Sequence, residues 1–152
     1  MLEVREGSLG LAVHARHAMG PGRLLLECRG QRMPHRTRHT IQSDFDCHVD
    51  FPAPMRLLNH SCEPNCGVVL TRGTDTILLY TLREVEAGEE LTIDYCTFEN
   101  EIHYMTGPCL CGEPKCRGRI TGFKDLTPEN LARLDGYIAE YLQPVGAVSQ
   151  AG

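Results

Sequence analysis

The sequence predicts a mainly β fold with one helix near the C-terminus, and three observations support this prediction. Short apolar stretches with β-branched residues recur along most of the chain, as expected for strands. Glycine occurs 15 times and proline 9 times, so many turns should separate these stretches. Apolar residues at helical spacing occur near the C-terminal end. A length of 152 residues suits one compact domain with at most a small appendage.

The first predicted strands lie within residues 2–15 and 24–28. Met19-Gly20-Pro21-Gly22, between them, has the composition of a turn. Residues 30–39 read GQRMPHRTRH, a polar and irregular stretch that we interpret as a solvated surface loop. This loop carries Arg32, Arg36 and Arg38 beside two histidines.

A β-hairpin and one more strand are predicted in the middle of the chain. Residues 68–82 contain β-branched and aromatic residues around Arg72-Gly73-Thr74-Asp75, which favours a hairpin with its turn at the glycine. Ala87-Gly88-Glu89 indicates a second turn, and it leads into a short strand over residues 90–95.

A helix is predicted over about 128–142. Thr127-Pro128-Glu129 has the form of an N-cap, a proline at the first helical position and an acid in the first turn. One apolar stripe follows at helical spacing and comprises Leu131, Leu134, Ile138, Tyr141 and Leu142. Pro144 should end the helix, and the small, weakly polar residues 145–152 should fray.

The charge balance limits the classes of partner. Twenty acidic against 15 basic residues give a net charge of −5, which argues against nucleic acid as a direct ligand and favours a cationic partner. No stretch has the roughly 20 apolar residues that a membrane span needs, and no export signal is visible. With 8 cysteines in such a chain, metal ligation or free thiols are favoured over a disulfide scaffold, and we expect a reducing intracellular compartment.

One candidate metal site is the run from Cys109 to Cys116, which reads CLCGEPKC. It holds three thiols, and its glycine and proline allow the sharp turns that would bring them to one ion. A closed structural zinc site needs four ligands, so the fourth must come from elsewhere in the chain. The remaining cysteines are all candidates at this point, namely Cys28, Cys47, Cys62, Cys66 and Cys96.

A second polar cluster lies in residues 56–66. Asn59, His60 and Ser61 follow an apolar pair and precede a turn at Pro64. Taken alone, this cluster is either a polar ligand site or a turn with a satisfied histidine.

Three motifs together resemble a SET-domain lysine methyltransferase with a post-SET zinc motif. They are Asn59-His60-Ser61-Cys62-Glu63-Pro64-Asn65, Glu90-Leu91-Thr92-Ile93-Asp94-Tyr95, and Cys109-Leu110-Cys111 through Cys116-Arg117-Gly118. The resemblance runs from about residue 10 to 120. It implies a β-clip-like SET fold of small curved sheets, in which the Asp94-Tyr95 segment threads past the segment after Asn59 as a pseudoknot. We therefore expect a SET domain over 1–106 and a post-SET zinc-binding segment over 107–120, followed by the C-terminal helix and tail over 121–152.

The resemblance assigns roles residue by residue. Tyr95 matches the tyrosine whose hydroxyl lies beside the reacting amine. The residues that match the family's S-adenosylmethionine contacts are Gly10, Leu11, Ala12, Asn59, His60 and Leu110. The zinc ligands are implied to be Cys62, Cys109, Cys111 and Cys116, with one ion per chain. Ile93 stands where the family carries a phenylalanine or tyrosine that tunes the product, so we expect more than one methylation of the same lysine.

The function implied is transfer of a methyl group from S-adenosylmethionine to a lysine side chain of a protein or peptide substrate, in the cytoplasm or in a nucleus. Two departures from the family pattern leave alternatives open. Ala12 occupies the position of the second glycine in a turn that contacts the cofactor. Cys28 occupies the position of a tyrosine in the lysine channel, and Tyr104 could supply the missing hydroxyl. A SET-fold protein that binds S-adenosylmethionine but acts on a small molecule, or is inactive, is one alternative. A zinc-stabilised interaction module is the other.

Overall fold

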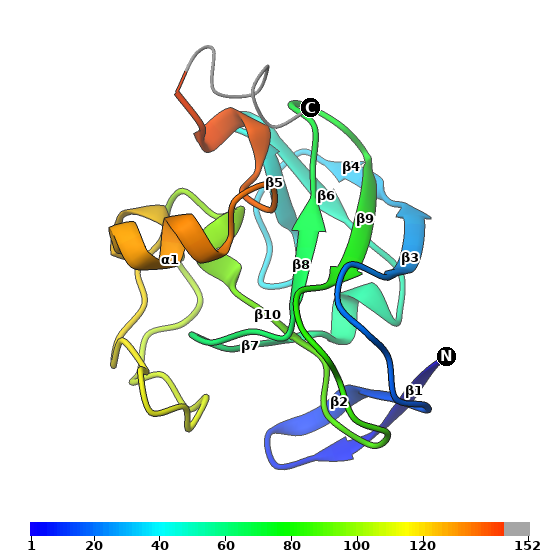
Figure 1. The fold of residues 1–152 in the computed structure, drawn as a ribbon. Coiled ribbons are helices and arrows are strands. Elements are labelled where there is room, and N and C mark those ends of the chain that lie inside the picture. Colours follow the sequence, from blue (N-terminus) through cyan, green and yellow to red (C-terminus); the bar gives the residue numbers. More distant parts are fainter. Residues whose placement is uncertain (145–152) are drawn as a thin grey trace.

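The computed structural model describes residues 1–144, and it is a mainly β fold of four small sheets (Figure 1). The expected behaviour of residues 145–152 lies outside the described residues. The strands are β1 (Leu2–Gly7), β2 (Gly10–Ala15), β3 (Leu24–Arg29), β4 (Gln31–Met33), β5 (Ile41–Asp44), β6 (Cys47–Asp50), β7 (Asn59–His60), β8 (Cys66–Val69), β9 (Thr76–Thr81) and β10 (Thr92–Ile93). Short 3-10 turns cover Met55–Leu57, Tyr95–Thr97, Phe123–Asp125 and Glu140–Leu142. None of the helices in residues 1–144 is long and apolar enough to cross a bilayer.

Three of the sheets are antiparallel, and one of them joins the early strand β3 to β9, about fifty residues further along the chain. β1 pairs with β2, β9 lies between β3 and β8, and β6 lies between β4 and β5. The predicted hairpin is present as β8 and β9, and Gly73 has the positive φ (74°) that its turn requires. The stretch predicted as a surface loop begins with β4 instead, because Gln31, Arg32 and Met33 pair with β6.

The fourth sheet joins two segments that are distant in sequence. β7 and β10 run parallel, with Thr92 opposite Asn59 and Ile93 opposite His60. The predicted strand over 90–95 is therefore shortened to two residues, and the chain turns into a 3-10 turn at Tyr95. This pairing places the Asn59-His60 motif directly beside the Asp94-Tyr95 motif.

The C-terminal helix is shorter than predicted. α1 covers only Pro128–Arg133, although its start agrees with the sequence, because Thr127 caps it and Pro128 occupies the first turn. Gly136 adopts a φ of 88°, which no α-helix contains, so the chain bends after Leu134. The residues of the predicted apolar stripe are still largely buried. Ile138 and Tyr141 reach the core through the bend and the turn Glu140–Leu142 and not as part of a helix.

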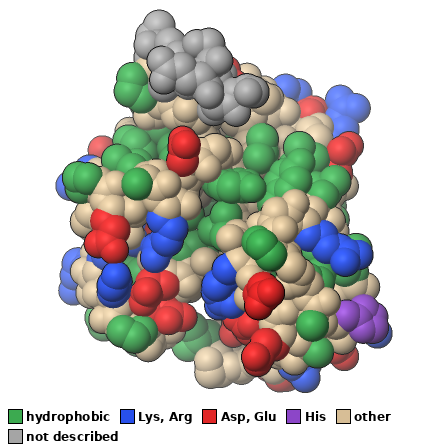
Figure 2. Space-filling model, viewed as in Figure 1, with side chains coloured by type: hydrophobic (Ala, Val, Ile, Leu, Met, Phe, Trp, Pro, Cys, Tyr) green, Lys and Arg blue, Asp and Glu red, His purple; other side chains and the backbone are tan. Residues whose placement is uncertain are grey.

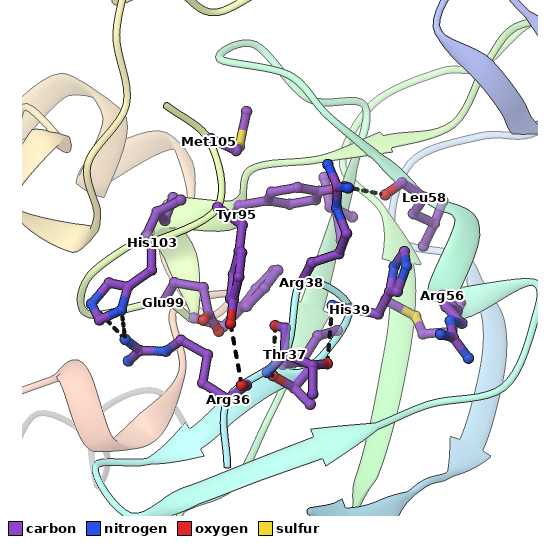
Figure 3. Close-up of a pocket in the computed structure, with 17 residues that line it drawn as sticks. Arg36, Thr37, Arg38, His39, Arg56, Leu58, Tyr95, Glu99, His103 and Met105 are labelled. Carbon is purple, nitrogen blue, oxygen red and sulfur yellow. Dashed lines mark hydrogen bonds between the residues drawn. The ribbon is translucent and has the colours of Figure 1, made fainter. Parts of the chain in front are cut away.

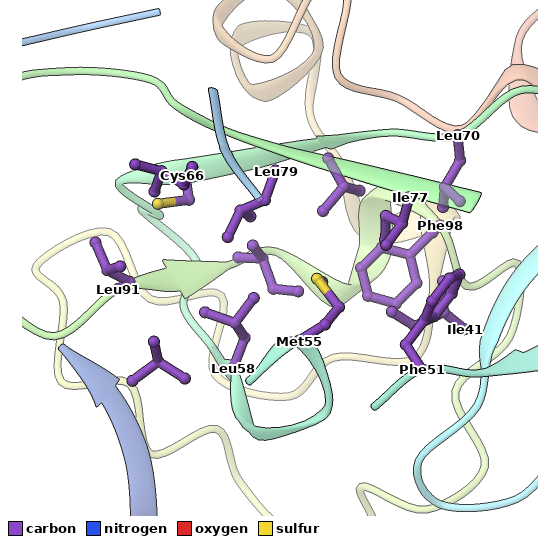
Figure 4. Packing of buried hydrophobic residues seen from close by; sticks show 14 of the residues in the cluster. Ile41, Phe51, Met55, Leu58, Cys66, Leu70, Ile77, Leu79, Leu91 and Phe98 are labelled. Carbon is purple, nitrogen blue, oxygen red and sulfur yellow. The ribbon is translucent and has the colours of Figure 1, made fainter. Parts of the chain in front are cut away.

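The main core lies between these sheets (Figure 4). Strand β9 shows the period-2 pattern of a strand with one buried face, because Ile77 and Leu79 are fully buried while Leu78 and Tyr80 are partly exposed. Met55, Phe51 and Phe98 fill the centre of this core. A second, smaller cluster packs around the C-terminal segment and comprises Cys62, Cys96, Ile120, Leu126, Leu134 and Ile138.

Candidate functional site

A pocket lies beside the β7–β10 pair, and Tyr95 forms part of its wall (Figure 3). Its apolar lining comes from both halves of the chain and comprises Ile41, Met55, Leu58, Ile93, Phe98, Ile102 and Met105. One side of the pocket is formed by residues 36–40, which precede β5, and the opposite side by residues 102–105. The pocket therefore has an apolar interior with polar side chains along its edges, as is common for ligand sites.

The Tyr95 hydroxyl is held in place by the backbone. It donates a hydrogen bond to the Leu58 carbonyl oxygen at 2.6 Å. Burial, with a smaller contribution from the Glu90 carboxylate, raises the pKa of Tyr95 to about 12, so the phenol stays protonated at neutral pH. The single hydroxyl proton of Tyr95 is engaged in the hydrogen bond to Leu58. Toward a ligand, the oxygen can therefore act only as an acceptor, through its lone pairs.

His60 connects this tyrosine to the cysteine cluster. Its Nδ1 accepts a hydrogen bond from the Tyr95 backbone amide at 3.0 Å, and its Nε2 lies 3.4 Å from the Cys62 sulfur. Burial, assisted by the nearby Arg117 guanidinium, lowers the pKa of His60 to about 3. The imidazole is therefore neutral, and since Nδ1 is an acceptor the proton is assigned to Nε2, which can donate to the sulfur.

Four cysteine sulfurs converge behind His60. Those of Cys62, Cys109, Cys111 and Cys116 lie within 4.8 Å of one another. The Cys62 and Cys109 sulfurs are 3.8 Å apart, and a tetrahedral zinc with bonds of about 2.3 Å places its sulfurs about 3.8 Å apart. The donor set and spacing thus fit a structural zinc ion. The structure brings together the four cysteines named from the resemblance and leaves Cys28, Cys47, Cys66 and Cys96 outside the cluster.

An ion pair lies between this cluster and the site. Arg117 Nη2 is 2.9 Å from the Asp94 carboxylate, which is almost fully buried, and the Arg117 backbone amide donates to the Cys62 sulfur at 3.4 Å. Burial would lower the pKa of Arg117, but the Asp94 carboxylate beside it raises that pKa, so the arginine stays charged. Asp94 also caps the turn at Tyr95 through the Cys96 amide. Asp94 therefore has a structural role in holding Tyr95.

The residues matched to S-adenosylmethionine fall into two groups. Asn59 donates through Nδ2 to Glu90 Oε2 at 3.0 Å, and Glu90 lies beside Gly7 at the end of β1 and forms a backbone bridge with His14 of β2. Gly10 has a φ of 106° with open space where a Cβ would be. Ala12 is buried in regular β2 with no positive φ, so its backbone has no need of glycine.

The other group is formed by His60 and Leu110. His60 contacts Cys62, and Leu110 follows Cys109, so the cysteine cluster connects these two residues. Leu110 is 66% exposed, which leaves an apolar side chain free to cover a ligand. An amide and a carboxylate suit the amino-acid end of S-adenosylmethionine, and an uncovered leucine suits its adenine ring. The residues present therefore fit this cofactor.

Three site features were not found by sequence reasoning. Glu90 links Asn59 to β2, Glu99 lines the pocket, and residues 36–40 form one of its walls. The arginines of the 30–39 stretch are visible in the sequence, but nothing in their spacing shows that this loop faces a site. Tyr104 does line the pocket with Tyr95, as its proposed substitution for a channel tyrosine requires, whereas Cys28 is not among the lining residues in the described part of the chain.

The comparisons with known proteins agree with this geometry. The family model for the SET domain matches residues 10–96, so the chain belongs to the SET domain family. Among its relatives are the H3 lysine-4 specific histone-lysine N-methyltransferases of Yarrowia lipolytica and Schizosaccharomyces pombe, at 45% and 46% identity over 67 residues each. The matches cover 43% of this chain but only 6% and 7% of those relatives.

Solved structures support the same fold. A crystal structure of KRYPTONITE in complex with mCHH DNA, an H3(1-15) peptide and SAH aligns with a TM-score of 0.61 and 28% identity, over 78% of this chain and 29% of that one. A second KRYPTONITE structure, with mCHG DNA and SAH, aligns with a TM-score of 0.63 and 27% identity, over 78% and 28% of the two chains. The mainly β fold of small sheets predicted from the sequence is therefore confirmed.

Proposed function

We propose that this protein transfers a methyl group from S-adenosylmethionine to a lysine side chain of a protein substrate. The observation that carries the proposal is the position of Tyr95, whose hydroxyl is fixed on the Leu58 carbonyl beside an apolar pocket. The family membership and the names of the relatives, which are histone-lysine methyltransferases, support the same reaction.

S-adenosylmethionine supplies an electrophilic methyl group on a sulfonium. Gly10, Leu11, Ala12, Asn59, His60 and Leu110 are proposed to hold it, and Glu90 to orient the Asn59 amide. The chain has to admit a lysine amine in its neutral form, since an ammonium has no lone pair with which to attack. The apolar lining around Ile93 and Phe98 would lower the pKa of an entering lysine by desolvation.

Tyr95 is the proposed catalytic residue. Its hydroxyl donates a hydrogen bond to the Leu58 carbonyl oxygen, and its oxygen can accept one from an N–H of the amine, which directs the lone pair of the nitrogen away from the tyrosine. Such orientation can account for much of a rate enhancement, since well-aligned reactions gain roughly 7 to 11 kcal/mol from entropy lost before the reaction. Ile93 beside Tyr95 carries no hydroxyl, so we propose that the pocket admits a lysine that is already methylated.

We further propose one structural zinc ion per chain, bound by Cys62, Cys109, Cys111 and Cys116. The names of the relatives, which are histone-lysine methyltransferases, favour a nuclear or cytoplasmic compartment for this protein. Histone H3 is a substrate to test, because the names of the relatives specify it.

The experiment that tests the proposal is incubation of the zinc-loaded protein with methyl-labelled S-adenosylmethionine and a cell extract, followed by mass spectrometry of labelled residues. Label on lysine that disappears with Tyr95→Phe supports the proposal. Tight binding of S-adenosylmethionine with label only on a small molecule, or on nothing, would favour the first alternative. Absence of cofactor binding would favour a zinc-stabilised interaction module.

A further inference from the structure

The charge of the pocket is opposite to the charge of the chain. The chain carries a net charge of −5, and on the face shown in Figure 2 acidic and basic side chains lie intermixed. The charged residues that line the pocket are instead three arginines and one glutamate, namely Arg36, Arg38, Arg56 and Glu99. Two histidines, His39 and His103, lie among them. A ligand that approaches this pocket therefore meets a locally basic surface.

Two of these arginines are available to a ligand. Arg38 is exposed and forms no ion pair within residues 1–144, and it lines the same pocket as Tyr95. Arg56 is 42% exposed, and its only ion pair in the same described range is a long one of 3.6 Å to Asp50. Their guanidinium groups present the geometry that binds carboxylates through paired hydrogen bonds.

The third arginine, Arg36, contacts the wall of the pocket and is not available to a ligand. Arg36 Nη1 lies within 2.9 Å of both His103 ring nitrogens, yet its Nε is buried without a hydrogen-bond partner in the described residues. The Tyr104 hydroxyl lies 3.5 Å from the Arg36 carbonyl oxygen, which joins the loop to the opposite wall. Arg36 thus contributes positive charge beneath the edge of the pocket.

Acidic groups near the pocket offset only part of this charge, and none of them forms an ion pair with Arg38 in the described residues. Burial raises the pKa of Glu99 to about 7, with Arg36 opposing the rise, so this carboxyl is only partly ionised at neutral pH. Its Oε2 accepts a hydrogen bond from the Gln42 amide at 2.8 Å. Glu101 lies 3.3 Å from His103, and Asp50 faces Arg56.

We propose that the pocket selects a lysine that is flanked by acidic residues, whose carboxylates bind Arg38 and Arg56 at its edge. This inference rests on the proposed function, because it takes the pocket as the entrance for the lysine. It also gives a role to the basic stretch of residues 30–39, which composition alone suggests is a solvated loop. A peptide with arginines beside the lysine would bring like charges together at the same edge.

The test uses three dye-labelled peptides that share a central lysine and carry two glutamates, two glutamines or two arginines on each side of it. Their binding to the zinc-loaded protein with S-adenosylhomocysteine is measured by fluorescence anisotropy, and methyl transfer to each is measured with S-adenosylmethionine. At about 50 mM salt the acid-flanked peptide should bind about 10-fold more tightly than the arginine-flanked one, as a few exposed ion pairs provide. Higher salt should reduce the ratio, because it screens exposed charges.

Variants locate the source of the preference. Arg38→Glu should reduce the ratio at least 3-fold, and Arg38→Glu combined with Arg56→Glu should abolish or invert it. Arg23→Glu is the matched control, because Arg23 is exposed and lies outside the pocket, and it should leave the ratio unchanged. Thermal melts of all variants verify that they are folded.

The outcomes separate the inference from the proposed function. Equal binding of the three peptides, no binding of any, tighter binding of the arginine-flanked peptide, or a ratio that survives both substitutions overturns the inference. If methyl transfer to lysine occurs in those cases, the proposed function stands. A preference for the acid-flanked peptide without methyl transfer to any peptide supports the inference and contradicts the proposed function.

Discussion

The β8–β9 core and the C-terminal segment are stabilised by different means. The core buries large apolar side chains such as Ile77, Leu79 and Phe98 against regular strands. Residues 107–119 contain no helix or strand, and their inward-facing side chains are mainly cysteines, which join the smaller cluster of Cys62, Ile120 and Leu134. Hydrophobic burial accounts for the first region, whereas the four clustered cysteines of the second support our proposal that a zinc ion holds its irregular backbone.

The largest effect is expected from loss of a proposed zinc ligand. Cys111→Ser should abolish zinc binding and methyl transfer, since a structural zinc site contributes about 10 to 16 kcal/mol in small domains. Metal analysis and methyl-transfer assays of the purified variant check this. Cys66→Ser is the matched control, because Cys66 is buried in the main core outside the cluster. It should retain one zinc per chain, and loss of zinc in both variants would contradict the assignment.

A substitution in the core should lower the stability of the protein and leave zinc binding intact. Leu79→Ala removes a fully buried side chain and should lower the free energy of unfolding by about 2 to 5 kcal/mol, while the folded protein keeps its zinc. Urea denaturation and metal analysis measure the two quantities. Leu131→Ala, on the exposed side of α1, should change stability by less than about 1 kcal/mol. Equal losses in the two variants would show that burial does not distinguish these sites.

Tyr95→Phe separates chemistry from stability. It should lower kcat by roughly 100-fold, about 2.7 kcal/mol, because it removes a preorganised hydroxyl at the proposed reacting centre. The Leu58 carbonyl loses a hydrogen bond worth about 1 kcal/mol of stability, so the melting temperature should fall only slightly. Affinity for S-adenosylmethionine should stay the same. Unchanged kcat would remove Tyr95 from the mechanism.

Glu99 should affect stability only in a way that depends on pH. Because burial raises its pKa to about 7 in the folded protein, the folded state binds a proton that the unfolded state releases above about pH 4.5. Its contribution to stability is therefore largest below pH 4.5 and is lost as the pH rises to about 7, by on the order of 2 to 3 kcal/mol.

Glu99→Gln should flatten that slope, since the neutral amide can still accept the Gln42 hydrogen bond. The measurement is the free energy of unfolding of both proteins at pH 5, 6, 7 and 8. Parallel curves for the two proteins would show that Glu99 does not titrate in this range.

Sequence reasoning succeeded where a local signal was sufficient. The hairpin around Gly73 and the N-cap at Thr127 are set by turn and capping chemistry within a few residues. The convergence of Cys62 with Cys109 came from a family resemblance, because no spacing rule brings together residues 47 positions apart.

It failed where tertiary packing decided the outcome. Leu134, Ile138 and Tyr141 follow helical spacing and are buried, yet Gly136 ends the helix and the chain reaches the same core by another path. The loop arginines looked solvated because a sequence does not show which surface a loop covers. Glu90 and Glu99 gave no signal for the same reason.

Hydrogen exchange of the zinc-loaded protein, with and without a strong chelator, tests the different stabilisation of the two regions most directly. Chelation should expose the amides of residues 102–119 to rapid exchange, while amides of β8 and β9 keep their protection. Protection that is unchanged by chelation in residues 102–119, or lost equally in β8 and β9, would contradict the claim that metal orders the C-terminal segment and burial orders the core.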